Sequence, residues 1–177
     1  MFTLPLLAVL LQALSGAPLD PLQAPAGTKA IVFLFTSTDC PISNRYAPEL
    51  RRLGQRFAAR GVAFRLVYVE ATETPAAIRA HARAYGLGED VLRDPGHALV
   101  QLVGATVTPE AAVLVADPAG PRLVYRGRID DRAVDFGRAR PQPRTRDLAD
   151  VLESLTAGHA LTLRTTTAVG CFIPELR

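Results

Sequence analysis

A cysteine followed by a proline, at a point where the hydrophobic period changes, is the residue best placed for chemistry. Cys40 follows residues 31–35, an unbroken apolar run of the kind found in strands covered on both faces. After Pro41, apolar residues recur at the spacing of one helical face, at positions 46, 50, 53 and 57. Cys40 is therefore expected to cap a helix at a strand-to-helix junction.

This position favours a reactive thiolate. Pro41 suits the first helical position, where its missing N–H is not needed, and Cys40 then lies beside backbone donors without helical partners. Those donors and the positive end of the helix dipole stabilise a thiolate relative to a thiol. Because the thiolate is the attacking form in sulfur exchange, Cys40 is predicted to be a redox nucleophile.

The segment resembles the thioredoxin-like superfamily, in a redoxin or thiol-specific-antioxidant type of domain. There, a hydrophobic strand and a Cys-x-x-Cys motif lead into a helix containing Ala-Pro, and Phe35, Cys40 and residues 47–48 match in register. Asp39 stands where tryptophan is usual, and Ser43 stands where the second cysteine would be. The resemblance therefore implies a one-cysteine Cys-Pro-x-Ser motif, which cannot form a disulfide within itself.

A second stretch resembles another landmark of the same superfamily. Thr108-Pro109 precedes the apolar run 111–116, as does the cis proline that opens the strand beside the active cysteine. A turn sequence at 117–120 then predicts an antiparallel return along 123–129. The residues that this resemblance assigns to support of the active site are Thr38, Pro41, Ser43, Thr108 and Pro109.

The predicted fold is a three-layer α/β thioredoxin-like domain with a mixed central sheet. Strands beginning at residues 31 and 63 flank a helix, which implies a parallel pair, whereas those from 111 and 123 are antiparallel. We expect one redoxin domain over 18–160 and a C-terminal tail over 161–177. Within the domain, residues 130–144 show no periodicity, and Thr145 is expected to cap a final helix ending at Gly158.

Cys171 is the only other cysteine in the chain. It follows a flexible-looking segment, 165–170, and Val169-Gly-Cys171 resembles a segment of a narrower group of bacterial redoxin proteins. Three roles stay open for it: a thiol that resolves the adduct on Cys40, a buried thiol, or an intermolecular bond. We predict an intramolecular Cys40–Cys171 disulfide in the oxidised protein.

Charged and metal-binding groups add little to this site. Arginines are frequent between 126 and 146 and are expected mostly on a solvated surface opposite Asp130, Asp131 and Asp135, although Arg126 or Arg128 is a candidate to stabilise the Cys40 thiolate. The three histidines show no ligand spacing. Asn44 stands where copper-delivering relatives have a second cysteine, so neither a metal nor another cofactor is expected.

The leading function is a thiol-disulfide oxidoreductase in which Cys40 attacks and Cys171 or an outside thiol resolves, with protein thiols as partners. One alternative is peroxide reduction, since Ser37 fits the peroxiredoxin pattern, but Phe33 stands where that pattern has proline. The other alternative is a non-catalytic binding module with a structural Cys40–Cys171 disulfide. Nucleic-acid binding is not expected, because 20 basic residues face 17 acidic ones without a basic cluster.

Residues 1–17 contain an apolar run suited to a signal-peptide core, with small residues at 15–17 for cleavage. This predicts an extracytoplasmic protein, periplasmic or secreted, without stable membrane insertion after processing. No basic residue precedes the run, however, and residues 14–22 also resemble the hairpin before the first core strand of redoxin relatives. In that interpretation the protein would be cytoplasmic.

Overall fold

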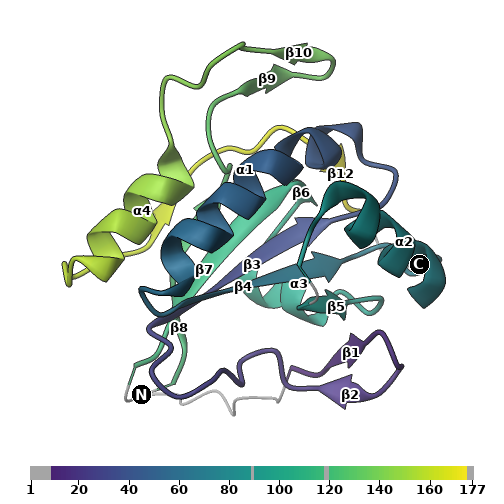
Figure 1. Ribbon diagram of the computed structural model, residues 1–177, viewed down its shortest axis with the longest axis horizontal. Coiled ribbons are helices and arrows are strands. Elements are labelled where there is room, and N and C mark those ends of the chain that lie inside the picture. Colours follow the sequence, from purple (N-terminus) through teal and green to yellow (C-terminus); the bar gives the residue numbers. More distant parts are fainter. Residues whose placement is uncertain (1–8, 89, 118–119, 175–177) are drawn as a thin grey trace.

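The computed structural model describes residues 9–88, 90–117 and 120–174, so residues 1–8 of the expected signal peptide lie outside the described residues. Its helices lie on both faces of a mixed sheet (Figure 1). The described helices are α1 (Pro41–Ala58), α2 (Pro75–Tyr85), α3 (Ala98–Val103) and α4 (Asp147–Thr156). None of them has both the length and the apolar character needed to cross a bilayer.

The main sheet has the strand order β11-β8-β7-β3-β4-β5-β1-β2. Its centre, β3 (Ala30–Thr36), pairs in parallel with β4 (Val62–Tyr68) and antiparallel with β7 (Glu110–Val115). The other strands are β1 (Leu11–Ala13), β2 (Pro18–Leu19), β5 (Val91–Arg93), β8 (Arg122–Gly127) and β11 (Arg164–Thr165). The predicted mixed sheet is thus confirmed, with the two expected strand pairs.

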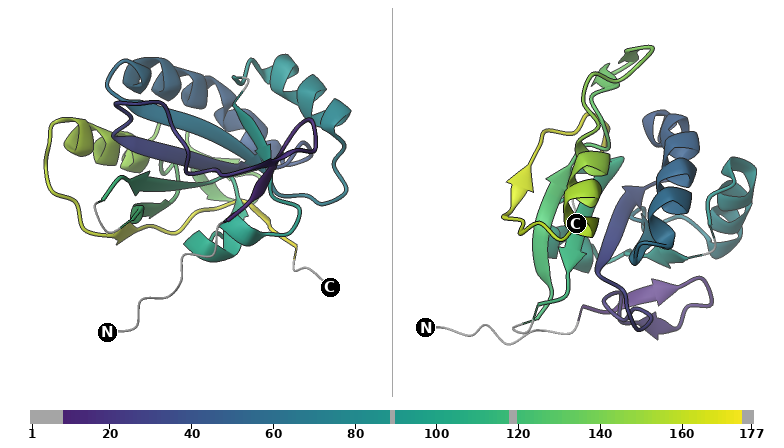
Figure 2. Two further views of the ribbon diagram at one scale, coloured as in Figure 1. Left: turned by 90° about the horizontal axis from the view of Figure 1, so that it is seen from below. Right: turned by 60° about the vertical axis from the view of Figure 1, so that its left-hand side comes forward.

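Alternation along β3 sends side chains into two cores. Val32 and Leu34 pack in the core that contains residues of α1, α2 and α4, whereas Phe33 and Phe35 pack in the core that contains residues of α3. All seven residues of β3 are buried, as expected for a strand covered on both faces. The helices lie accordingly in two layers with the sheet between them, which confirms the three-layer prediction (Figure 2).

The amino-terminal hairpin is present, and its first strand begins before the expected residue 14. β1 pairs antiparallel with β2 around Gly16, whose φ of 86° suits glycine, and β1 also extends the sheet by pairing with β5. Leu11 is fully buried in the core on the α3 side. The two paired strands flank Ala17, the residue at which signal cleavage was predicted, and that cleavage stays a prediction.

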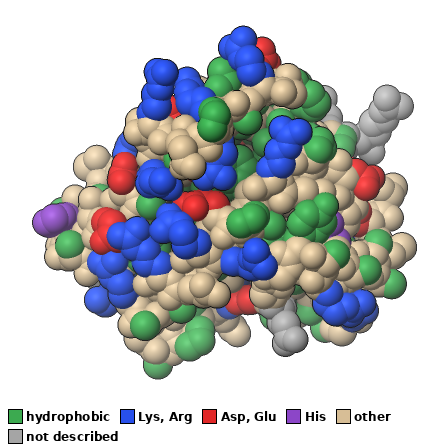
Figure 3. Space-filling model, turned by 45° about the horizontal axis from the view of Figure 1, so that its top comes forward, with side chains coloured by type: hydrophobic (Ala, Val, Ile, Leu, Met, Phe, Trp, Pro, Cys, Tyr) green, Lys and Arg blue, Asp and Glu red, His purple; other side chains and the backbone are tan. Residues whose placement is uncertain are grey.

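The segment 130–144 differs from the expected irregular loop. It contains a short hairpin of β9 (Ala133–Asp135) and β10 (Arg138–Ala139), on a face crowded with arginine side chains (Figure 3). Asp130 accepts a hydrogen bond from the Tyr46 hydroxyl at 2.7 Å, and Asp131 accepts from the backbone N–H of Arg144 at 2.7 Å. Both carboxylates are buried, and each pairs with an arginine, Asp130 with Arg132 and Asp131 with Arg140, so they are counter-charges as expected but lie beneath the surface.

The expected cap of the last helix is also corrected. α4 begins at Asp147 with Arg146 in the cap position, and no side chain closes the cap by a hydrogen bond. Thr145 donates its hydroxyl to Asp147 instead, at 2.9 Å. Asp147 in the first turn also bonds Arg128 and Arg164, so a buried carboxylate occupies the positive end of this helix.

Candidate active site

Cys40 lies at the strand-to-helix junction, as predicted. β3 ends at Thr36, α1 begins at Pro41, and Cys40 is the capping residue with extended backbone angles. Its Sγ accepts a hydrogen bond from the Ser43 N–H at 3.4 Å, so one donor at the start of the helix is used by sulfur. Side-chain oxygen usually fills this role, and its replacement by sulfur places the thiol on the positive end of the helix.

The second predicted landmark meets the first. The Thr108–Pro109 peptide bond is cis, as expected from the sequence. It follows β6 (Val107–Thr108), and the carbonyl oxygen of Thr108 accepts a hydrogen bond from the Cys40 thiol at 3.0 Å. The proline turn and the helix start, far apart in the chain, thus contribute backbone groups to one sulfur.

Cys171 reaches the same point from the tail. It lies on β12 (Cys171–Phe172), which pairs antiparallel with β6 so that Cys171 faces Thr108 (Figure 1). Its Sγ lies 2.7 Å from the Sγ of Cys40, and both cysteines are free thiols. The structure therefore brings the two cysteines together across 131 positions of sequence.

The two thiols differ in their pKa values. Burial raises the pKa of Cys40, but hydrogen bonds with Cys171, Ser43 and Thr108 outweigh it and leave that pKa below its ordinary value. Burial and the neighbouring Cys40 sulfur raise the pKa of Cys171 to about 12. A single negative charge in this pair is consequently favoured on Cys40.

Ser43 and Thr38 support the turn in different ways. Ser43 is buried and serves Cys40 through its backbone N–H, while its own hydroxyl has no partner among the described residues. Thr38 donates its backbone N–H to Glu73 at 2.5 Å. Burial raises the pKa of Glu73 despite this bond. Thr38 therefore lies in the turn before Cys40, and Ser43 lies in the first turn of the helix after it.

Three residues next to this turn were not predicted. The Asn44 amide donates to the Thr38 carbonyl at 3.2 Å, and its oxygen faces His81 Nε2 at 2.7 Å. The Tyr68 hydroxyl lies 2.7 Å from His81 Nδ1. Burial lowers the pKa of His81, which fits a neutral ring that donates to Asn44 and accepts from Tyr68. No spacing in the sequence links these residues or Glu73 to Cys40.

The two candidate arginines are engaged elsewhere. Arg126 donates to the Gly104 carbonyl and lies 3.7 Å from Glu110, and Arg128 forms an ion pair with Asp147 at 2.8 Å. Neither is among the groups that shift the pKa of Cys40. The structure therefore gives neither Arg126 nor Arg128 the contact with Cys40 that the expected thiolate-stabilising role requires.

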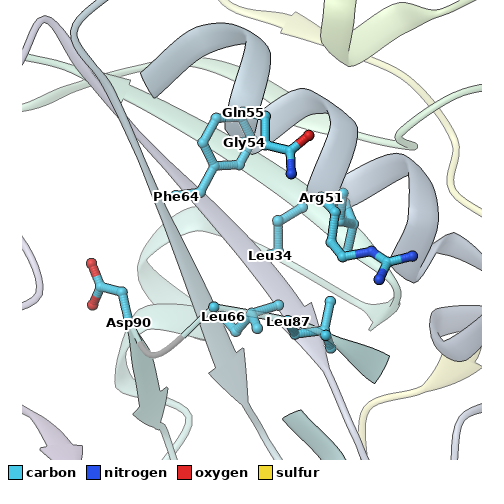
Figure 4. A pocket seen from close by; sticks show the side chains of 11 residues that line it. Leu34, Arg51, Gly54, Gln55, Phe64, Leu66, Leu87 and Asp90 are labelled. Carbon is cyan, nitrogen blue, oxygen red and sulfur yellow. The ribbon is translucent and has the colours of Figure 1, made fainter. Parts of the chain in front are cut away.

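A separate pocket lies between α1 and β4 (Figure 4). It has a volume of about 340 Å³, and its floor includes Leu34, Phe64, Leu66 and Leu87, with Arg51 among its polar lining residues. Neither cysteine lines it, so it is separate from the candidate thiol site. Among the described residues, no group of three or more His, Cys, Asp or Glu side chains is arranged to hold a metal ion.

A comparison with protein families gives a match over most of the chain. A family model described as the AhpC/TSA family matches residues 8–121. No curated protein matches the sequence.

Solved structures share the fold at low sequence identity. An uncharacterized conserved protein from Geobacillus kaustophilus is similar with a TM-score of 0.76 at 23% identity, covering 99% of this chain and 94% of that chain. A hypothetical protein from Sinorhizobium meliloti gives 0.71 at 23%, covering 93% and 88%. A secreted Mycobacterium tuberculosis disulfide oxidoreductase homologous to E. coli DsbE gives 0.53 at 18%, covering 85% and 96%. These likenesses show a thioredoxin-like fold.

Proposed function

The chain belongs to the AhpC/TSA family, and we propose that it is a thiol-disulfide oxidoreductase with Cys40 as nucleophile and Cys171 as resolving thiol. One observation carries the proposal: the two sulfurs lie 2.7 Å apart, beside the Thr108–Pro109 turn. The opposite pKa shifts of the two thiols support the assignment of roles.

The chemistry exchanges one disulfide for another. The Cys40 thiolate attacks one sulfur of a partner's disulfide, a new bond joins Cys40 to the partner, and the partner's other sulfur leaves as a thiolate. Cys171 then gives up its proton and attacks Cys40 Sγ, which releases the partner's second thiolate. The partner disulfide gains two electrons and two protons, and Cys40 and Cys171 lose them as they form a disulfide. In the reverse direction this disulfide oxidises a partner dithiol.

The partners proposed are protein thiols and disulfides. The M. tuberculosis structure of similar fold is described as a secreted disulfide oxidoreductase, which supports the same substrate class and an extracytoplasmic location for this chain. An oxidising compartment would also allow the Cys40–Cys171 disulfide to persist. Fractionation of cells that express the full chain tests the location, and retention in the cytoplasm would contradict it.

A graded glutathione series tests the function. Wild-type protein should pass from two thiols to one intramolecular disulfide at a defined potential, as measured by intact mass and peptide mapping. Cys40→Ser should abolish exchange, whereas Cys171→Ser should stop with glutathione attached to Cys40. His159→Ala, at an exposed position, is the matched control and should behave as wild type.

Two results would contradict the proposal. If Cys171→Ser completes exchange as wild type does, Cys171 is not the resolving thiol. If the Cys40–Cys171 bond never opens across the series, the bond serves a structural role, and the chain is then a binding module that retains the fold.

Peroxide reduction is a second candidate, favoured by the family match and by Ser37. Neither Arg126 nor Arg128 contacts Cys40, and Phe33 is packed in the core where the peroxiredoxin pattern has proline. We therefore expect slow oxidation of Cys40 by hydrogen peroxide. A rate constant approaching about 10⁷ to 10⁸ per molar per second, near the diffusional ceiling, would reverse this ranking.

A further inference from the structure

Access to Cys40 is blocked in the structure. Cys40 is 1% exposed, and its sulfur is hydrogen-bonded with the Cys171 thiol, the Ser43 N–H and the Thr108 carbonyl. A thiolate must reach its target sulfur along an open path before it can exchange. A partner protein therefore cannot react with Cys40 until the tail moves.

The tail covers Cys40 as an added strand. Cys171 pairs with Thr108 and Phe172 with Val107, and the Ile173 N–H donates to the Thr106 carbonyl at 3.0 Å. These bonds use the main chain of an extended segment, which is how peptides add to the edge of a sheet. An extended partner segment in the same register would make the same bonds and would put its own cysteine against Cys40.

The tail is held firmly at Thr166 and only weakly at β12, where it pairs with β6. Before the linker, Thr166 takes the Arg126 carbonyl, the Tyr125 hydroxyl and the Arg128 N–H as hydrogen-bond partners. After the linker, β12 has two residues, and Phe172 is 84% exposed. The linker residues 167–168 line a pocket of about 220 Å³ instead of filling it. Five residues beyond Thr166 span at most roughly 17 Å, so Cys171 can leave Cys40 while β11 stays paired.

Gly170 restricts which strands can pair with β6 in the place of β12. A Cβ at this position would lie 2.2 Å from the Thr108 oxygen and 2.7 Å from the Thr108 carbon, both backbone atoms. The φ of Gly170 lies outside the left-handed region, so the restriction is one of space and not of conformation. Any strand that takes the place of β12 therefore needs glycine immediately before its cysteine.

We propose that residues 170–173 are a built-in stand-in for the partner, a strand that must leave β6 before Cys40 can react. The same edge of β6 selects partner segments with the sequence Gly-Cys. This inference rests on the proposed oxidoreductase function and names its substrate class: an extended peptide that carries an oxidised cysteine preceded by glycine. Because the partner strand and the tail compete for one edge, Cys171 can attack the mixed disulfide only as the partner strand leaves.

The test uses the full chain carrying Cys171→Ala, in which Cys40 is the only thiol. The probes are two peptides, Val-Gly-Cys-Phe-Ile-Pro and Val-Ala-Cys-Phe-Ile-Pro, each joined through its cysteine to thionitrobenzoate, and Ellman's reagent as a small disulfide. Release of the coloured thiolate gives the rate with Cys40. The glycine peptide should react about tenfold or more faster than the alanine peptide, because the added methyl group meets backbone that cannot yield.

A second variant tests whether the tail strand must leave β6 before Cys40 can react. Gly170→Ala, added to Cys171→Ala, should separate the tail from β6 and raise the rate with the glycine peptide by about tenfold. Gly54→Ala on the same background should leave the rate unchanged. Gly54 is a matched control because its Cβ would meet no atom within 4 Å. Circular dichroism should show the same fold for all three proteins.

The outcomes separate the two proposals. Equal rates for the two peptides on a protein that reacts with Ellman's reagent refute the Gly-Cys preference, even if Gly170→Ala does not fold. An unchanged rate in folded Gly170→Ala refutes the proposal that the tail strand blocks Cys40. If Cys40 reacts with no disulfide at all, including Ellman's reagent, the oxidoreductase function itself is wrong and the inference falls with it.

Discussion

Cys40 and Cys171 present their sulfurs to each other from segments that are held very differently. Cys40 lies between a seven-residue buried strand and an eighteen-residue helix. Thr38, in the turn between them, is hydrogen-bonded with Glu73 and Asn44. Cys171 lies on a two-residue strand whose next residue, Phe172, projects into solvent. In the proposed function the attacking thiol is therefore the firmly held one, and the resolving thiol is the one on a short, partly exposed strand.

The difference extends to the charges behind each segment. The pKa of Cys40 is lowered by hydrogen bonds near it, which no ionised side chain supplies. The tail is tied at β11 by Arg164, which pairs at 2.5 Å with Asp147, a carboxylate that also holds Arg128. Cys40 thus depends on hydrogen bonds with uncharged neighbours, whereas the tail depends on an ion pair with a buried carboxylate. This contrast can be tested from both ends.

The largest expected effect joins the two segments. Oxidation to the Cys40–Cys171 disulfide closes a loop of 131 residues and should raise the free energy of unfolding by about 5 kcal/mol on the chain-entropy estimate. Urea denaturation of oxidised and reduced protein measures it. Cys171→Ser is the control and should show no difference between the two conditions. Two free thiols, or only intermolecular dimers, under oxidising conditions would contradict the pairing.

A smaller effect should follow from loosening the anchor of the tail. Asp147→Asn removes a buried carboxylate from Arg128 and Arg164, which are both partly exposed, and should cost roughly 2 to 3 kcal/mol. Asp150→Asn, an exposed position in the same helical turn, should cost far less. Equal urea midpoints for the two variants would show that the ion pairs do not hold the tail.

The same carboxylate gives a pH dependence of defined sign. Burial raises the pKa of Asp147, but hydrogen bonds with Arg128 and Thr145 outweigh it and hold that pKa below its ordinary value. A depressed carboxyl pKa stabilises the fold above the unfolded pKa of about 3.9, and this stability is lost as pH falls through the folded value. Asp147→Asn should therefore lose less stability than wild type below about pH 4.

The smallest effect concerns the order in which the two thiols react. With limiting iodoacetamide near neutral pH, Cys40 should be alkylated before Cys171, because the pKa of Cys40 is lowered and that of Cys171 is raised to about 12. Peptide mapping across a pH series measures the order. In urea the two cysteines should react alike. Preferential labelling of Cys171 in the folded protein would reverse the roles assigned here.

Much of the nucleophile's surroundings could be predicted, because it is encoded in adjacent residues. An apolar run, Cys40, Pro41 and a helical stripe determine a strand, a cap and a helix by local rules of backbone and period. The cis bond before Pro109 followed from resemblance, whereas the mixed sheet followed from the strand-helix-strand spacing and a turn sequence, and both are present in the structure.

Only the tertiary structure decided what surrounds Cys40 and the turn before it. Glu73, Asn44 and His81 come from different turns and helices, and the arginines and Asp130 find partners that composition does not specify. Cys171 faces Thr108 because of the register of a two-residue ladder, and a slip of one residue would turn its sulfur to the other side. Sequence alone determined a thiol with the local environment of a nucleophile. Long-range register decided how the sulfur of Cys171, the only other cysteine, is brought against Cys40, because pairing energy between distant strands depends on contacts that no local pattern contains.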